Sequence, residues 1–123
     1  MASRVVNTGL NKIIDEFVGG NITVEEIGVG SDGTTASVSD TSLGTELARY
    51  ASDNERRATA SGRFNATIPE TDDNVDDETL RELAGFVDVA GADDMVFRID
   101  FAETPKTAGS KIEIEVQADI ENI

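Results

Sequence analysis

The sequence predicts an α+β fold that is mainly β, with an N-terminal amphipathic helix packed on an antiparallel sheet or sandwich. Apolar residues recur with a helical period near the N-terminus, over residues 7–18. Later segments alternate apolar and polar residues with the period of a strand. No strand–helix–strand unit is recognisable, which favours antiparallel pairing. A chain of 123 residues suits a single domain, residues 1–123, that buries roughly two-thirds of its unfolded surface.

The first predicted element is a helix from Asn7 to Val18, ended by the glycines at 19 and 20. Its apolar face is formed by four residues spaced i, i+3, i+4 and i+7: Leu10, Ile13, Ile14 and Phe17. A strand is predicted next from Ile22 to Val29, where Glu25 and Glu26 fit a bulge. This helix is expected to cover the sheet that follows it.

The middle of the chain mixes loop, helix and strand patterns. Gly, Ser, Thr and Asp dominate from Gly30 to Ser42, which predicts a loop. One or two helical turns are predicted from Leu43 to Ala51, because its apolar residues would share one helical face. A strand is expected from Ala58 to Ile68, with Gly62 at a hairpin or a bulge.

An acidic stretch from Glu70 to Glu78 is expected to be an exposed loop. Leu80 to Val89 has an ambiguous pattern: the leucine spacing fits a helix, whereas the β-branched residues near its end favour a strand. Met95 to Phe101 alternates apolar residues on one face, and turns are predicted on either side of it, at 91–94 and 104–110. Lys111 to Ile120 alternates strictly and is the clearest strand of the chain.

The charge balance narrows the partners. The chain has 25 acidic and 10 basic residues, a formal net charge of −15 and a pI of about 4.1. The negative charge repels phosphate backbones and anionic lipid heads, so nucleic acid and membrane surfaces are poor partners. No apolar run approaches membrane-spanning length, so we expect no membrane insertion. Only three of the bases are lysines, and together with the acidity this indicates a salt-loving host; an acidic mesophilic protein is the alternative. No disulfide is available, because the chain has no cysteine.

A glycine pattern, Gly28-x-Gly30-x-x-Gly33, formally matches the dinucleotide-binding fingerprint. A bound pyrophosphate needs a helix N-terminus directly after the glycines. The residues that follow, TTASVSDTS, have no helical apolar period. We therefore expect a glycine-rich turn and no cofactor.

Two groups of acidic residues could in principle bind a metal ion. Asp72, Asp73, Asp76, Asp77 and Glu78 offer oxygen ligands, but they lack the alternating spacing and the glycine of a calcium loop. The pair at positions 93 and 94, Asp93-Asp94, fits a polar turn. A solvated charge run with no metal is the expectation for both.

Catalysis is not expected. The chain has neither His nor Cys, so nucleophilic catalysis lacks its usual base and its thiol. A serine activated by Lys12 is conceivable, but Lys12 lies on the polar face of the predicted helix. Four phenylalanines are expected in the core rather than on a binding platform: Phe64, Phe86, Phe97 and Phe101. We therefore predict no catalytic residue and no enzyme activity.

One segment, Ile27 to Arg49, points to a function through its order of motifs. Its sequence IGVGSDGTTASVSDTSLGTELAR resembles the N-terminal domain of tailed-phage tail-fibre and baseplate proteins, in which a Gly-rich turn and an SDT-x-LG-x-E-x-R run follow the first strand. The likeness covers most of the chain in the same order, and it begins before this segment with a helix motif at Val6, Asn7, Gly9, Leu10, Asn11 and Ile13. It continues in Leu80, Glu82, Gly85 and Phe86, in the MVFR-x-x-F motif of 95–101, and in TPKTAGS at 104–110. In that family, residues 80–89 would form a strand, and we adopt this expectation.

The resemblance implies a non-enzymatic structural protein of a tailed virus particle, most simply a tail or baseplate fibre or adaptor. The acidic stretch at 70–78 is heavier than the bacterial pattern, which fits a virus of halophilic archaea. The chain ends at Ile123 without a fibre shaft, so a capsid vertex (turret or decoration) protein and a receptor- or glycan-binding adhesin module stay as alternatives. The implied partners are other copies of the chain, as a trimer in a tail or a pentamer at a vertex, other virion proteins and, for an adhesin, host cell-surface glycans. Assembly would take place in the host cytoplasm.

Overall fold

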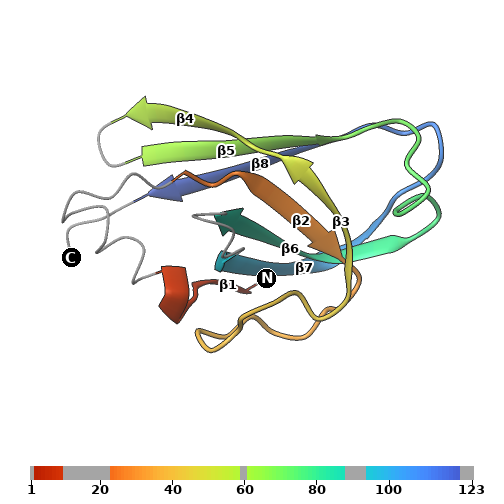
Figure 1. Ribbon diagram of the computed structural model, residues 1–123. Coiled ribbons are helices and arrows are strands. Elements are labelled where there is room, and N and C mark those ends of the chain that lie inside the picture. Colours follow the sequence, from red (N-terminus) through yellow and green to blue (C-terminus); the bar gives the residue numbers. More distant parts are fainter. Residues whose placement is uncertain (1, 10–22, 59–60, 88–93, 120–123) are drawn as a thin grey trace.

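Two antiparallel sheets form the protein. The computed structural model describes residues 2–9, 23–58, 61–87 and 94–119. Within these residues the strands are β1 (Ala2–Val5), β2 (Glu26–Gly30), β3 (Glu46–Ala51), β4 (Asp53–Ala58), β5 (Ser61–Ile68), β6 (Thr79–Val87), β7 (Asp94–Pro105) and β8 (Ile112–Asp119). The larger sheet has the order β1-β7-β6-β2-β3, and the smaller one the order β4-β5-β8 (Figure 1). Mainly β architecture with antiparallel pairing is therefore confirmed.

The main core lies between the two sheets. Ile27 and Val87 from the larger sheet pack with Ala66 from the smaller one. Further along, Val29 and Leu80 meet Ile68 in a second buried cluster. The alternation of side chains along each strand places these residues on the inner faces. The protein is thus a small sandwich.

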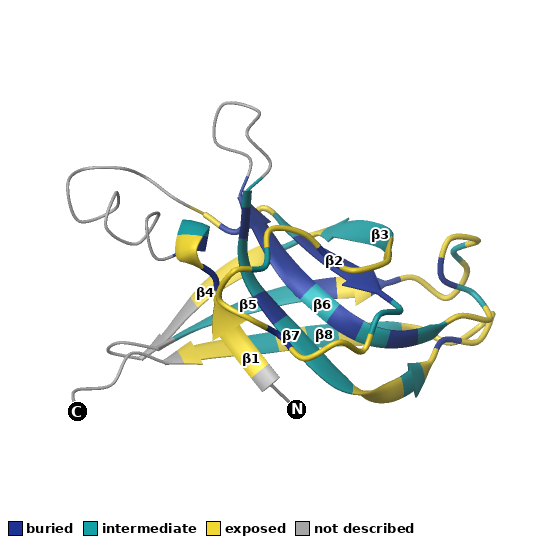
Figure 2. Cartoon of the chain, turned by 90° about the horizontal axis from the view of Figure 1, so that it is seen from below, coloured by how far each residue is buried: buried dark blue, intermediate teal, exposed yellow. Residues whose placement is uncertain are grey.

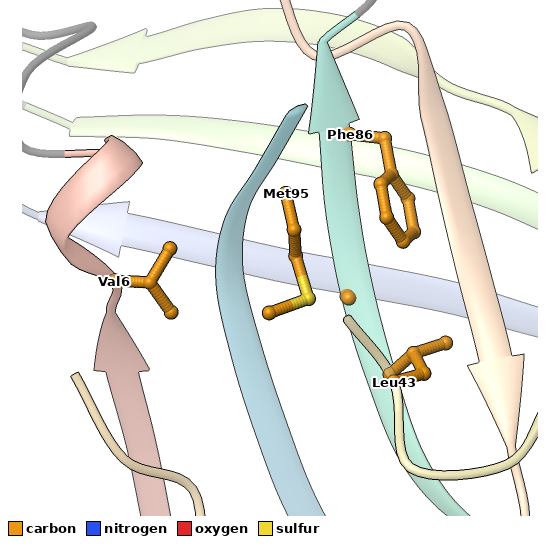
Figure 3. Packing of buried hydrophobic residues seen from close by; sticks show 5 residues of the cluster. Val6, Leu43, Phe86 and Met95 are labelled. Carbon is orange, nitrogen blue, oxygen red and sulfur yellow. The ribbon is translucent and has the colours of Figure 1, made fainter. Parts of the chain in front are cut away.

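A second apolar layer covers the outer face of the larger sheet. Val6, Leu43, Ala84, Phe86 and Met95 form a buried cluster there (Figure 3). Leu43 comes from the long connection between β2 and β3, residues 31–45, which we call the cover loop. Strand β6 consequently contributes buried side chains to both faces, and Figure 2 shows it buried along much of its length, in contrast to β1.

Strands were well predicted where the alternation was regular. The expected strand at 111–120 is β8, the one at 80–89 is β6, and the one at 58–68 contains β5. The phenylalanines expected in the core are in packed clusters: Phe64, Phe97 and Phe101 lie against the inter-sheet core, and Phe86 lies under the cover loop. The rings of Phe64 and Phe97 stack with their centroids 5.7 Å apart.

The helical turns predicted for Leu43 to Ala51 are wrong. Residues 46–51 form strand β3, which pairs with β2. Ala51 lies opposite Glu26 at one end of the pair, and Glu46 lies opposite Gly30 at the other. Spacings of three and four residues suggested a helix, but backbone pairing with β2 outweighs that local pattern. Strands β1 and β4 were not predicted, because neither has a clear apolar alternation.

The single apolar face predicted for Met95 to Phe101 is also corrected. Gly85 pairs with Phe97 and Phe86 pairs with Met95, so one extra residue, Val96, is inserted in β7. This bulge turns Met95 to the outer cluster, whereas Phe97 packs in the inter-sheet core. The strand also continues to Pro105, beyond the predicted end.

The predicted N-terminal helix falls mostly outside the described residues. Residues 7–9 are helical, and residues 10–22, which carry its apolar face, are not among those described. The bulge expected at Glu25-Glu26 is replaced by a register shift between Val29 and Gly30. No helix within the described ranges is long and apolar enough to cross a membrane.

Candidate functional site

A buried ion pair lies beneath the cover loop. Glu82 in β6 and Arg98 in β7 meet with Arg98 Nε 3.2 Å from Glu82 Oε1, and their side chains are 0% and 3% exposed. Both point to the outer face of the larger sheet, away from the inter-sheet core. A buried pair of this kind is stable only when its remaining donors and acceptors are satisfied.

The backbone of the cover loop satisfies Glu82. Its Oε1 accepts a hydrogen bond from the amide of Gly44 at 2.8 Å, and its Oε2 accepts bonds from Asp32 at 3.1 Å and Thr45 at 2.8 Å. One carboxylate therefore binds both ends of the loop. Such charge-assisted bonds are stronger than bonds between neutral groups.

Arg98, on the face of the sheet that the cover loop covers, binds the same loop. Its guanidinium donates to the carbonyl of Thr34 at 2.8 Å and to the carbonyl of Asp32 at 3.3 Å. It also lies 3.4 Å from the Asp40 carboxylate. Asp100, two residues further along β7, accepts a bond from the amide of Ala36 at 2.7 Å. We call the three anchoring residues Glu82, Arg98 and Asp100 the loop clamp.

Within the loop, Asp32 makes a local turn. Its Oδ1 accepts bonds from the hydroxyl and the amide of Thr34, at 2.7 and 2.9 Å. These bonds, the hydroxyl one first, lower the pKa of the Asp32 carboxyl. The Asp-x-Thr sequence thus shapes the backbone and offers its carbonyls to Arg98.

The glycines of the dinucleotide-like pattern serve packing. Gly28 and Gly30 lie in β2. A Cβ at Gly28 would stand 2.7 Å from the ring of Phe86, and one at Gly30 would overlap the Thr45 carbonyl and the Glu82 carboxylate. Gly33 lies in the cover loop beside the Arg81 side chain. Gly28 and Gly30 therefore mark places where β2 lies close to the Phe86 ring, the Thr45 carbonyl and the Glu82 carboxylate.

A second buried charge organises the end of the sandwich where β5 leads to β6. Lys106 is fully buried, and its ammonium donates to the Asp76 carboxylate and to the carbonyls of Glu70, at 3.1 Å, and Thr107, at 2.9 Å. Its amide also donates to the Glu78 carbonyl at 2.9 Å, and its carbonyl accepts from the amide of Asp77 at 2.7 Å. The three acceptors use all three donors of the ammonium and join the 70–78 loop to the turn after Pro105.

The acidic stretch is accordingly not a uniformly solvated charge run, which corrects the expectation. Asp76 is committed to Lys106, and Asp72 accepts a 2.7 Å bond from the Tyr50 hydroxyl. That bond is the main cause of a lowered pKa for Asp72, while burial first, and then the same bond, raise the pKa of Tyr50. Asp73, Asp77 and Glu78 remain exposed, as expected. In the part of the chain that the structure describes, no three acidic residues are grouped to hold a metal.

An apolar groove opens where the edge of the smaller sheet faces the larger one. Its cavity measures about 470 Å³. Ile99 and Phe101 of β7 line one side, and Ile112, Ile114 and Val116 of β8 line the other. These residues are only partly buried, so the described strands leave the inter-sheet core partly open along this edge.

Of the remaining candidate positions, the structure describes only Asp94, which begins β7. Its neighbour Asp93 and the candidate Lys12 lie outside the described residues. The loop clamp and Lys106 were missed by sequence reasoning. The available signal was the placement of charged residues inside otherwise apolar strands, at Glu82 and Arg98.

Comparison with family models, with curated proteins and with solved structures finds no match for this chain.

Proposed function

We propose that this protein is a non-enzymatic structural component of a tailed virus particle, most simply a tail or baseplate fibre or adaptor protein of a virus of halophilic archaea. In this proposal the chain assembles with copies of itself and with neighbouring virion proteins. The amphipathic helix expected over 7–18, packed on the sheet, belongs to the same proposal.

One observation carries the proposal: the segment with the family-like motifs is held in a fixed conformation by buried side chains. Residues 31–45 are fixed by Glu82, Arg98 and Asp100, so the buried charges of this region are bonded to the loop backbone and to one another. Lys106 plays the same part for the 70–78 loop. Rigid, shaped loops on a small sandwich suit a protein that works by fitting against its neighbours.

The test is mass spectrometry of purified virus particles from the source culture. The expected result is that peptides of this chain copurify with the particles at a fixed ratio to the other virion proteins, and are depleted from the uninfected-cell fraction. Immunogold labelling of the same particles separates a tail location from a capsid vertex. Absence from the particles, together with binding of the isolated protein to a cellular small molecule, would overturn the proposal.

Glycan arrays address the adhesin alternative. A purely structural part is expected to bind no glycan, because the two buried charge clusters are saturated by protein groups. Specific binding by isolated protein at high salt would favour the adhesin reading instead.

A further inference from the structure

Strand β8 presents both a strand edge and an apolar row at one place. Among the described strands it pairs only with β5, along its whole length. Ser61 of β5 lies opposite Asp119 at one end, and Ile68 lies opposite Ile112 at the other. Its opposite edge borders the groove lined by Ile99 and Phe101. A strand edge that no other described strand pairs with, and that lies beside apolar side chains, is a template for pairing with another strand.

The sequence of β8 is compatible with pairing to itself. Opposite residues of an antiparallel pair project to the same face of a sheet. A two-fold arrangement in which a residue faces its own copy therefore keeps Ile112, Ile114 and Val116 of both copies on the groove side. If one copy slid by one residue along the other, one of the two apolar rows would face the solvent. Only slides of two residues keep both rows on the groove side, and each such slide moves the centre of the pair by one residue.

Charge selects one of these registers. With Glu115 facing its own copy, Glu113 faces Gln117, Lys111 faces the aspartate at position 119, and Ile114 faces Val116. The only like-charge pair is then Glu115 with itself. Each Glu115 is already paired with Arg63 of its own chain, whose Nη1 lies 2.8 Å from Glu115 Oε1 and whose Nη2 lies 2.7 Å from Glu55 Oε2, so the repulsion between the two copies of Glu115 is reduced. Opposite charges across strands stabilise a pair, and like charges destabilise it.

The neighbouring registers are worse. Centring on Ile114 sets Glu113 against Glu115 twice, and centring on Val116 sets Glu113 against the aspartate at 119 twice. Centring on Glu113 does oppose Lys111 to Glu115. It leaves only residues 112–114 of the strand paired, however, whereas the register centred on Glu115 pairs residues 112–118.

We propose that two copies of this chain join through β8 in an antiparallel two-fold pair centred on Glu115, which merges the two smaller sheets into one of six strands. The apolar row of each β8 then extends the lining of the groove. This inference deepens the self-association of the proposed function, and it rests on that proposal only for the claim that the chain associates with itself. A trimer or pentamer would have to use other surfaces in addition to this one.

Cysteine cross-linking tests the register, since the natural chain has no cysteine. Opposite residues of the pair have Cα atoms about 5 Å apart, within disulfide reach. The variant E115C, oxidised mildly in 3 M KCl, is expected to form a covalent dimer. E113C and Q117C are matched controls on the same face. Four residues separate each of them from its own copy, about 13 Å, so neither should cross-link alone, but an equimolar mixture of the two should.

Light scattering of the unmodified protein in 3 M KCl completes the test, and a dimer is the expected particle. A monomer at all concentrations would overturn the inference. Equal cross-linking of E113C, E115C and Q117C alone would also overturn it, because it would indicate random collision. A monomer that is nevertheless found in virus particles would sink this inference and leave the proposed function standing, and a β8 dimer absent from particles would do the reverse.

Discussion

At the scale of single residues, three buried charged side chains hold the cover loop and the 70–78 loop in place. Glu82, Arg98 and Lys106 are the buried charged residues of the described chain, and each is bonded to backbone groups that lie far away in sequence. A charge in such a place is costly unless every bond is made. These charges therefore stabilise the fold only when the loops are in place to bond them. In any alternative packing they would be buried without partners and would destabilise the protein.

Replacement of Glu82 by Gln should lower the free energy of unfolding by about 3–5 kcal/mol, because Arg98 loses its buried partner and an amide N–H₂ must face backbone donors. Urea denaturation at high salt measures this loss. Hydrogen exchange at the amides of Gly44 and Thr45 should accelerate in the same variant.

The matched control is E103Q. Glu103 bonds Arg81 at 2.9 Å, but its side chain is 70% exposed. The same chemical change there should cost no more than about 0.5 kcal/mol. Equal effects at the two positions would contradict the clamp.

Replacement of Tyr50 by Phe should make the stability difference from the natural protein depend on pH. Asp72 has a lowered pKa in the folded state, so its contribution is present above the unfolded value of 3.8 and is lost as the pH falls through the folded value. Tyr50 has a raised pKa, so its contribution is present below the unfolded value of 10.0 and is lost as the pH rises through the folded value.

The difference in unfolding free energy between the two proteins should therefore form a plateau from about pH 5 to about pH 9, with losses at both ends. Urea titrations at a series of pH values measure it. A difference that stays constant down to pH 3 would show that the bond between Tyr50 and Asp72 does not matter.

At the scale of elements, the strands differ in how much of their structure is local. Strand β8 was predicted correctly because a strict alternation of apolar and polar residues is typical of a strand alone. Its pairing with β5 agrees with this local pattern. Strand β3 was not predicted, because the spacing of Leu43, Leu47 and Tyr50 fits a helix and only β2 decides the outcome. The bulge at Val96 is equally invisible in the sequence, since it depends on the register with β6.

The candidate site shows the same division. The local turn of Asp32 and Thr34 lies within three residues and belongs to a segment that was correctly predicted as a loop. The clamp joins residues 50 positions apart, as in Glu82 with Asp32, or 64 apart, as in Asp100 with Ala36. Charges buried by such distant contacts look like surface charges in a sequence of this acidity.

Gly30→Ala is predicted to destabilise the fold by at least about 2 kcal/mol, because the added methyl group would displace both the Thr45 carbonyl and the Glu82 carboxylate. Gly62→Ala, in β5, is the control. The nearest atom to a Cβ at Gly62 is the Glu55 carbonyl oxygen at 3.6 Å, so the change should stay within about 0.5 kcal/mol. Thermal melts of the two variants compare them directly, and a tolerated Gly30→Ala would contradict the close approach.

At the scale of the whole molecule, the net charge of −15 opposes the compact state. Few of the acids are neutralised by buried partners, and most described ones lie on the surface. The melting temperature should therefore rise as KCl increases from 0.1 M to 3 M, because salt shortens the range of repulsion. Circular dichroism at a fixed protein concentration follows the transition.

Sucrose at matched viscosity is the control, since it adds no ionic screening. A melting temperature that does not change with KCl would contradict the salt-loving interpretation. A rise with KCl that sucrose reproduces would point to preferential exclusion of the cosolute and not to charge.

The loop clamp also has a consequence for the order in which the protein can form during synthesis. The cover loop, 31–45, leaves the ribosome well before Glu82, and before Arg98 and Asp100 by more than 50 residues. Until then, the loop has only its local bonds, such as those from Thr34 to Asp32 and from the amide of Ser31 to the carbonyl of Thr45. We therefore expect the loop to reach its final conformation in a late step, when β6 and β7 join the sheet and supply the clamp.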